Sequence, residues 1–200
     1  MSDRKNGVSV IVCCYNSANR LEQTLTHLFN QEVSPGTDWE LIVVNNNSTD
    51  NTVETAQSLY SQTSQTIPFS IVDEPKPGLS NARNKGFESA IYDYALMVDD
   101  DNWLSSNYVQ TVFDDLSENP KAGMVGGLGI AELEGNQPAW FKQYASCYAT
   151  GPQAEAGDGP IRTSEELYGA GCALKLSVLQ QIREYGFTNI LSDRTGSSLI

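Results

Sequence analysis

Three consecutive aspartates, Asp99, Asp100 and Asp101, directly follow the apolar run "YALMV" at residues 94–98. Two carboxylates about 4 Å apart repel each other by roughly 4 kcal/mol at an effective dielectric of about 20. A partly buried cluster must therefore take up protons, move its carboxylates apart or hold a cation. Carboxylate oxygens suit Mg²⁺ or Mn²⁺, and Mg²⁺ commonly completes its coordination with substrate phosphates. The triplet thus predicts a divalent metal site that receives a phosphate-bearing ligand.

The simpler alternative is that each aspartate caps the next helix or solvates a turn, which is a common role for a single aspartate at a strand end. Three in succession favour the metal site instead. Arg83 and Lys85, which follow the turn at Pro77-Gly78, are candidates to add positive charge from a neighbouring strand exit, although they also suit a solvated helix surface. A bound metal would reverse the sign of the local potential and let an acidic chain bind an anion.

The composition restricts the classes of partner. The 200 residues suffice for one substantial domain, 40% of them are hydrophobic, and the formal net charge is −13. This charge opposes broad attraction to nucleic acid or anionic lipid. No stretch approaches the roughly 18 apolar residues of a membrane span, and the start "MSDRKNGVSV" lacks the apolar segment of a secretory signal. We therefore expect no nucleic-acid partner, no membrane span and a cytoplasmic location.

The cysteines carry no recognisable metal or disulfide pattern. A vicinal pair, Cys13 and Cys14, is followed by two distant single residues, Cys147 and Cys172, with no CxxC spacing. Such spacing is typical of neither a zinc site nor a disulfide framework. We expect reduced, packed thiols.

Strand-like and helix-like segments alternate along the first part of the chain. Short apolar runs rich in β-branched residues predict strands at 8–16, at the start of 39–52, at 67–75 and at 94–98. Apolar residues at helical spacing follow each run, at 21–29, 53–60, 79–91 and 109–116. A glycine-softened fifth strand is expected at 122–130, a long connection with short elements at 131–166, and a short strand or turn entering a helix at 167–182.

This order of elements is typical of a mostly parallel sheet with helices on both faces. Ligands of such sheets bind beyond the carboxyl ends of the strands. The informative residues are therefore those that follow the four strands, at 13–16, 45–50, 73–78 and 99–102.

Five stretches occur together in the order seen in family 2 glycosyltransferases: "VSVIVCCYN", "WELIVVNNNSTDNT", "GLSNARNKGFESA", "YALMVDDDNWL" and "GAGCALKLSVL". The chain resembles this family of inverting sugar-nucleotide enzymes closely over 8–130 and more loosely over 168–182. The resemblance implies an α/β, Rossmann-like GT-A nucleotide-diphospho-sugar transferase fold. Residues 1–130 would form the donor-binding half and 131–200 an incomplete acceptor-side portion of the same domain.

The resemblance also implies roles for individual residues. Nucleotide binding falls to Cys13, Tyr15, Asn16, Asn45, Asn46, Arg83 and Asp100, and metal binding to Asp99 and Asp101. Tyr15 would stack on the base. Asn45 and Asn46 occupy the place where the family usually has an aspartate, and these amides keep the capacity for hydrogen bonding. The turn at 169–172 would lie beside the sugar and the acceptor.

The implied reaction is an inverting displacement at the anomeric carbon, from which a nucleoside diphosphate departs with the help of Mn²⁺ or Mg²⁺. The implied donor is a nucleotide-diphospho-sugar, with a UDP-sugar favoured, and the acceptor is a saccharide or a lipid-linked molecule. An inverting enzyme also needs a general base. In the family this carboxylate follows a stretch resembling "LSDRTGSSLI", where this chain stops, so the catalytic base is not identified. Asp193 is expected to be structural, paired with Arg194.

Two other functions remain open at this level. A nucleotide-sugar-binding or scaffolding fragment would bind the donor without transferring the sugar, because it lacks the base. A nucleotidyltransferase would share the sheet and the metal carboxylates. That class ordinarily has a glycine-rich, basic phosphate loop after the first strand, and "CCYNSANR" supplies little of it.

Overall fold

The computed structural model describes residues 4–133, 135–154, 157–162 and 165–188, and the backbone of 194–195 and 198–199. Its strands are β1 (Lys5–Cys14), β2 (Trp39–Asn45), β3 (Phe69–Asp73), β4 (Tyr92–Asp99), β5 (Met124–Val125), β6 (Ala173–Lys175), β7 (Arg194–Thr195) and β8 (Ser198–Leu199). Its helices are α1 (Leu21–Phe29), α2 (Thr52–Gln62), α3 (Leu79–Ser89), α4 (Tyr108–Glu118), α5 (Phe141–Tyr144), the short 3₁₀ helix η1 (Ala145–Tyr148) and α6 (Leu176–Glu184).

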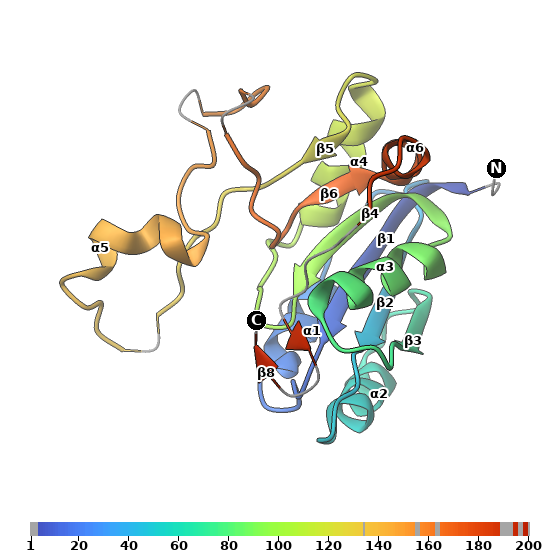
Figure 1. The fold of residues 1–200 in the computed structure, drawn as a ribbon. Coiled ribbons are helices and arrows are strands. Elements are labelled where there is room, and N and C mark those ends of the chain that lie inside the picture. The colour runs from blue at the N-terminus through green and yellow to red at the C-terminus, as the bar shows by residue number, and fades with distance from the viewer. Residues whose placement is uncertain are drawn as a thin grey trace.

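Six strands form one twisted sheet in the order β3-β2-β1-β4-β6-β5 (Figure 1). β1 pairs in parallel with β2 and with β4, and β2 pairs in parallel with β3. β6 runs antiparallel to both of its neighbours, β4 and β5. The four long strands are thus parallel, and their carboxyl ends meet at one edge of the sheet.

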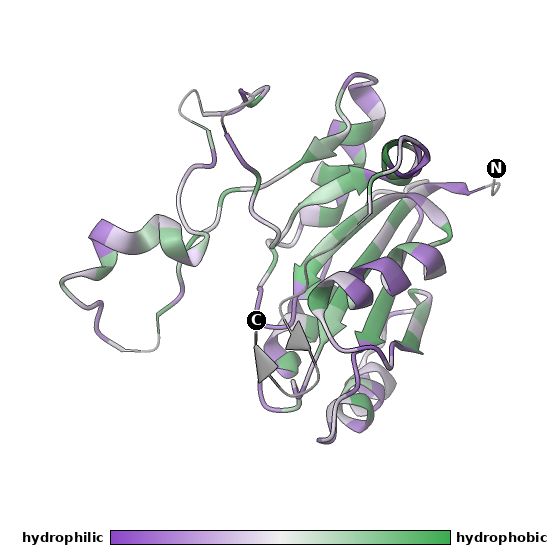
Figure 2. Cartoon of the chain, in the orientation of Figure 1, coloured by the Kyte–Doolittle hydropathy of each residue, from purple (hydrophilic) through white to green (hydrophobic). Residues whose placement is uncertain are grey.

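Helices cover both faces of this sheet, as the sequence predicts. Successive side chains of a strand point to opposite faces, so Val10 and Val12 enter one core while Ile11 enters the other. The first core takes its helical residues from α1, α2 and α4, and the second from α3 and α6. Figure 2 shows the strands as predominantly hydrophobic and much of α3 as hydrophilic. The α/β architecture with a mostly parallel central sheet is confirmed.

The second half of the sheet departs from the expected pattern. Of the glycine-softened strand expected at 122–130, Met124–Val125 joins the sheet without reaching β4, and Gly129 forms an isolated bridge with Gly151. Instead β6, from the segment at 167–182, lies between β4 and β5 in the reverse direction. The chain leaves the sheet after Val125, and the ring of Tyr108 lies where a side chain at position 127 would have to fit, so glycine is required there.

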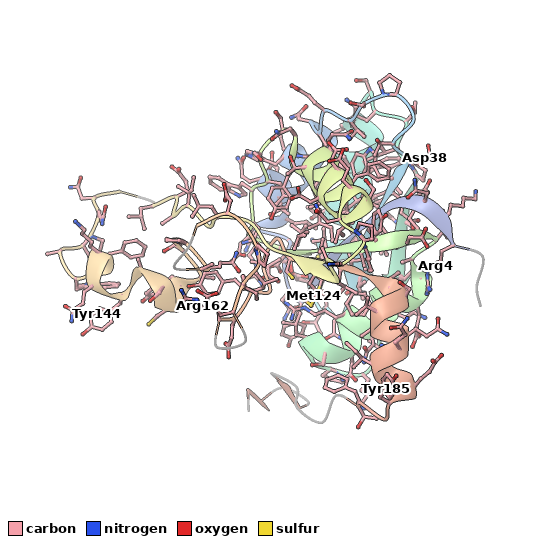
Figure 3. The ribbon with its side chains drawn as sticks, turned by 90° about the horizontal axis from the view of Figure 1, so that it is seen from above. Arg4, Asp38, Met124, Tyr144, Arg162 and Tyr185 are labelled. Carbon is pink, nitrogen blue, oxygen red and sulfur yellow. The ribbon has the colours of Figure 1, made fainter. Side chains whose placement is uncertain are left out.

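The described residues between 126 and 168 form an arm that projects away from the sheet and carries α5 and η1 (Figure 1). The rings of Trp140, Phe141 and Tyr148 pack on one another, with centroids 5.7 to 6.2 Å apart. Figure 3 places Tyr144 and Arg162 on this arm, away from Arg4 and Asp38 on the sheet. The expected long connection with short elements agrees with this arrangement. The assignment of 131–200 to the acceptor side stays a prediction.

None of the four cysteines, all of which lie in the described residues, is joined in a disulfide. The expected burial of the thiols holds for Cys14 and Cys172 but not for Cys147, which is exposed in η1. Burial raises the pKa of the Cys172 thiol to about 11. Among the described residues, no helix has the length and apolar character needed to cross a membrane.

One close approach between a helix and a strand gives a test of the packing. Gly86 in α3 lies against Ile11 of β1, and a Cβ at this position would overlap the Ile11 side chain. Alanine is the better helix former by about 1 kcal/mol, but an extra carbon in a close-packed core typically costs about 1–3 kcal/mol. The overlap is with Cγ2, close to the Ile11 backbone, so the cost lies in the upper part of that range. After subtraction of the helix gain, we expect Gly86→Ala to lower the free energy of unfolding by about 1–2 kcal/mol in urea titrations.

The matched control is Gly123→Ala, where a Cβ would meet Val178 at an ordinary contact distance of 3.5 Å. We expect this substitution to change the free energy of unfolding by less than about 0.5 kcal/mol. Equal stability of the two variants would contradict the proposed packing of α3 on β1.

Candidate functional site

The carboxyl ends of β3, β2, β1 and β4 place the predicted residues in one row. Strand register pairs Asp73 with Asn45, Asn45 with Cys14, and Cys13 with Asp99. Residues far apart in the sequence are therefore neighbours along this edge, as the parallel-strand argument requires.

The acidic triplet begins on the last residue of β4 and continues into a turn. Asp99 is partly buried, Asp100 is buried and Asp101 is exposed. Burial raises the pKa of the Asp99 carboxyl above its ordinary value; the Arg83 guanidinium opposes this rise, while Asp101 and Asp100 add to it. The ionised form of Asp99 is therefore disfavoured in the folded chain, chiefly by burial, and the repulsion expected from the sequence is a smaller contribution.

Two arginines, one on each side of the sheet, partly neutralise the triplet. Arg20, at the start of α1, places Nη2 2.8 Å from Asp100 Oδ2. Arg83, in α3, places Nη2 3.6 Å from Asp99 Oδ1. The sequence singled out Arg83 but not Arg20. The only available signal for Arg20 was a positive charge five residues beyond the strand exit at Tyr15, which many solvated residues share.

Asp100 also accepts a hydrogen bond from the hydroxyl of Ser17, a side chain with no exposed surface. The main-chain carbonyl of Asp100 accepts a second bond, from Thr24 Oγ1 at 2.9 Å. The segment from the end of β1 to the first turn of α1 thus holds both the carboxylate and the backbone of this residue. The carboxylate of Asp100 therefore already has partners within the chain. Its predicted contact with a nucleotide stays a prediction.

A glycine-rich turn at 169–172 lies beside the triplet. Met97 of β4 exchanges backbone hydrogen bonds with it, donating to the Cys172 carbonyl at 2.8 Å and accepting from the Gly171 amide at 2.9 Å. Tyr108 donates its hydroxyl to the Gly171 carbonyl at 2.6 Å. Gly169 lies close to Arg83: a Cβ there would be 2.8 Å from Arg83 Nη2. The turn therefore lies against Arg83, and its expected place beside the sugar and the acceptor stays a prediction.

The exit of β1 carries Cys13, Tyr15 and Asn16. Tyr15 leaves 37% of its surface exposed, so its ring is accessible from solvent. Asn16 adopts a left-handed backbone with φ 51°, and its side-chain oxygen accepts a hydrogen bond from the Thr49 amide at 2.8 Å. This bond ties the β1 exit to the β2 exit.

The two asparagines after β2 have different environments. Asn46 is buried; its Nδ2 donates to the carbonyls of Glu74 and Lys76, and its Oδ1 accepts from the Gly78 amide. Asn45 is partly exposed, and its Nδ2 donates to Asp73 Oδ1 at 2.8 Å. Asn46 therefore fixes the loop that leads to α3, while Asn45 binds the carboxylate of Asp73 at the end of the neighbouring strand. Nucleotide contacts by both residues stay predictions.

Asp99 and Asp101 offer the oxygen ligands that a hard divalent cation requires. No cluster of three potential metal-binding side chains is found within the described ranges, so the described protein residues alone do not form a complete cage. Mg²⁺ sites commonly use one or two protein carboxylates and complete the shell with water and substrate phosphates. The donor set fits such a shared site. Asp193, considered as a structural carboxylate, lies outside the described residues.

Comparisons with known proteins place this site in context. The family model described as Glycosyl transferase family 2 matches residues 9–182. The poly-beta-1,6-N-acetyl-D-glucosamine synthase of Staphylococcus epidermidis is 30% identical over 122 residues. The alignment covers 60% of this chain but only 28% of that synthase, so the chain spans less than a third of this relative's length.

Solved structures share the fold. TarS of S. aureus in complex with UDP superposes with a TM-score of 0.64 at 18% identity, over 88% of this chain and 49% of that chain. The mannosyltransferase PcManGT of Pyrobaculum calidifontis, in complex with GDP-Man and Mn2+, gives a TM-score of 0.63 at 20% identity, over 91% of this chain and 50% of that chain. The GT-A type fold expected from the sequence is confirmed.

The contrast between Asn45 and Asn46 can be tested by a matched pair of substitutions. Asn46→Asp would remove both donated hydrogen bonds and set a buried carboxylate against two carbonyl oxygens. We expect it to lower the free energy of unfolding at pH 7 by about 2–5 kcal/mol. Asn45→Asp places its charge next to Asp73 in a partly exposed position, and we expect a loss below about 1 kcal/mol. Equal losses in urea titrations would contradict the conclusion that Asn46 holds the loop before α3 in place.

Proposed function

Because the chain belongs to glycosyl transferase family 2, we propose that it transfers a sugar from a nucleotide-diphospho-sugar donor to an acceptor hydroxyl, with inversion and with a divalent metal as cofactor. One observation carries this proposal: the acidic triplet and Arg83 lie together at the carboxyl edge of a parallel sheet, where such folds bind ligands. Carboxylates for a cation and a guanidinium for an anion are the two groups that a metal-bound diphosphate requires.

In this proposal the donor nucleotide occupies the exits of β1 and β2. Tyr15 has the exposed ring needed to stack on a base, and Cys13, Asn16 and Asn45 supply polar groups around it. We propose a UDP-sugar as the donor. TarS, which shares the fold, has been solved with UDP-GlcNAc, and the relative from Staphylococcus epidermidis is named for a polymer of N-acetylglucosamine. UDP-N-acetylglucosamine is therefore the first donor to test.

Asp99 and Asp101 would hold the metal, Mn²⁺ or Mg²⁺, and PcManGT offers a precedent of the same fold with Mn2+. When bound, the metal supplies positive charge that stabilises the departing diphosphate. Arg83 reaches the same region, where its Nη2 lies 3.6 Å from Asp99 Oδ1. A diphosphate in this place would offer Arg83 a stronger, doubly accepting partner.

No described residue is assigned as the general base, and the acceptor, a saccharide or a lipid-linked molecule, stays a proposal. A cytoplasmic location also stays a prediction. The net charge of −13 continues to argue against nucleic acid as a partner. A donor-binding fragment without transfer is treated as an outcome of the experiment below.

The decisive experiment replaces Asp101 by asparagine. Metal stabilisation of a leaving group is worth several kcal/mol, so we expect Asp101→Asn to lower kcat/KM for sugar transfer by about a hundredfold or more. Transfer and hydrolysis are measured with UDP-N-acetylglucosamine, UDP-glucose and GDP-mannose, each with Mn²⁺ and after chelation with EDTA. Asp101 is exposed, so the variant should keep the unfolding midpoint of the parent.

The control is Asp115→Asn, an exposed aspartate on α4. We expect it to retain full activity. Transfer that survives both Asp101→Asn and EDTA would refute the metal-dependent reaction. Metal-dependent UDP binding by the parent chain without any transfer would support the donor-binding fragment instead.

A second test moves Arg83 without replacing it. In Gly169→Ala the new methyl group would meet Arg83 Nη2, the far end of a flexible side chain, which can swing away without disturbing the fold. Loss of a partly exposed contact between Arg83 and the donor diphosphate would cost about 1 kcal/mol of binding free energy. We therefore expect the donor KM to rise about fivefold. Thermal unfolding should stay at the parent value, and Gly123→Ala serves again as the control. An unchanged donor KM would remove Arg83 from the proposed donor site.

A further inference from the structure

The three aspartates of the triplet do not have equivalent surroundings. The side chain of Asp99 keeps 40% of its surface exposed and Asp101 is exposed, whereas the side chain of Asp100 keeps only 11%. The Oδ2 atom of Asp100 already receives two donors, the Ser17 hydroxyl and Arg20 Nη2. An oxygen satisfied twice within the chain gains little from a ligand unless it gives up one of these bonds.

The partners of Asp100 come from one short segment between β1 and the middle of α1. Ser17, Arg20 and Thr24, here called the clamp, hold its carboxylate and its carbonyl. The clamp is itself fixed, because the Ser17 amide donates to Thr52 Oγ1 at 2.8 Å at the start of α2. A chain of hydrogen bonds thus connects the exits of β4, β1 and β2.

Holding Asp100 in this way constrains both of its neighbours. Asp99 and Asp101 are joined to it by peptide bonds, so fixing its side chain and its carbonyl limits where their backbones can lie. Asn102 closes the same turn, accepting a hydrogen bond from the Asp99 amide at 3.2 Å through its side-chain oxygen. Arg20, although exposed itself, also supplies a positive charge to the triplet through its contact with Asp100. The outer carboxylates can then remain close together before any ligand arrives.

We propose that Asp100 is a positioning residue rather than a ligand of the donor or the metal. Ser17, Arg20 and Thr24 clamp this middle aspartate so that Asp99 and Asp101 are presented together for the metal and the donor diphosphate. The inference rests on the proposed function, because it assigns the outer pair to that site. It differs from the interpretation based on sequence, in which Asp100 touches the nucleotide itself.

A double-mutant cycle separates the two roles. The variants are Arg20→Gln, Asp100→Asn and the double substitution, and the measurement is calorimetric binding of UDP in the presence of Mn²⁺. If Asp100 acts through the clamp, each single substitution weakens binding by about tenfold and the double variant is no weaker than the worse single one. If Asp100 touches the nucleotide, Arg20→Gln leaves binding nearly unchanged, or the two effects multiply; either result overturns the proposal.

Further measurements keep the outcome clear. Thr24→Val removes the hydroxyl that holds the Asp100 carbonyl. We expect this variant to fold and to bind UDP severalfold more weakly. It takes the place of Asp100→Asn if Asp100→Asn fails to fold. Unchanged binding by Thr24→Val would count against the clamp. Arg183→Gln, an equal change on the exposed surface of α6, is the matched control and should bind as the parent does.

The same experiment distinguishes failure of the inference from failure of the proposed function. A parent chain that binds no UDP with Mn²⁺ refutes the proposed function and the inference with it. A parent chain that binds, and loses binding in Asp101→Asn but not in Arg20→Gln, keeps the function and refutes the clamp.

Discussion

Electrostatic repulsion among three adjacent carboxylates is the constraint around which the edge of this sheet is organised. Two guanidinium groups of the chain itself, one from each face of the sheet, partly compensate this repulsion. Arg20 belongs to the helical layer of α1, and Arg83 belongs to α3 on the other side. A metal ion is thus not the sole means of tolerating the triplet. Burial, with a smaller addition from Asp101 and Asp100, still holds the pKa of Asp99 above its ordinary value.

The strand exits are joined by side chains that bridge loops rather than by contacts within each loop. Asn46 holds the segment before α3, Asn16 reaches the loop before α2, and Asp100 receives the segment before α1. Each bridge uses a short polar side chain that meets backbone amides or hydroxyl groups from another exit. A rigid sheet with cross-tied loops supports a site that must keep several groups in register.

The sequence predicted the four parallel strands well, because long buried strands leave continuous β-branched runs such as Val8 to Val12, and the helices show regular apolar spacing. It also located the strand exits and their polar residues. It missed Arg20 and the bridging role of Asn46, since a hydrogen-bond partner more than twenty residues away leaves no local pattern. The placement of β6 between β4 and β5 was missed for the same reason: three residues, Ala173–Lys175, have no periodicity that reveals their neighbours.

That placement of β6 has a consequence for how the chain acquires its shape. β4 is made early, but the strand that covers its free side comes only after the whole arm has been synthesised. Until then an apolar strand edge stays open, which invites pairing with another chain. Long-range closure of this kind slows folding and leaves nascent intermediates prone to aggregation. The growing chain thus carries an open strand edge until the last step of sheet assembly, after the four-stranded parallel part can already have formed.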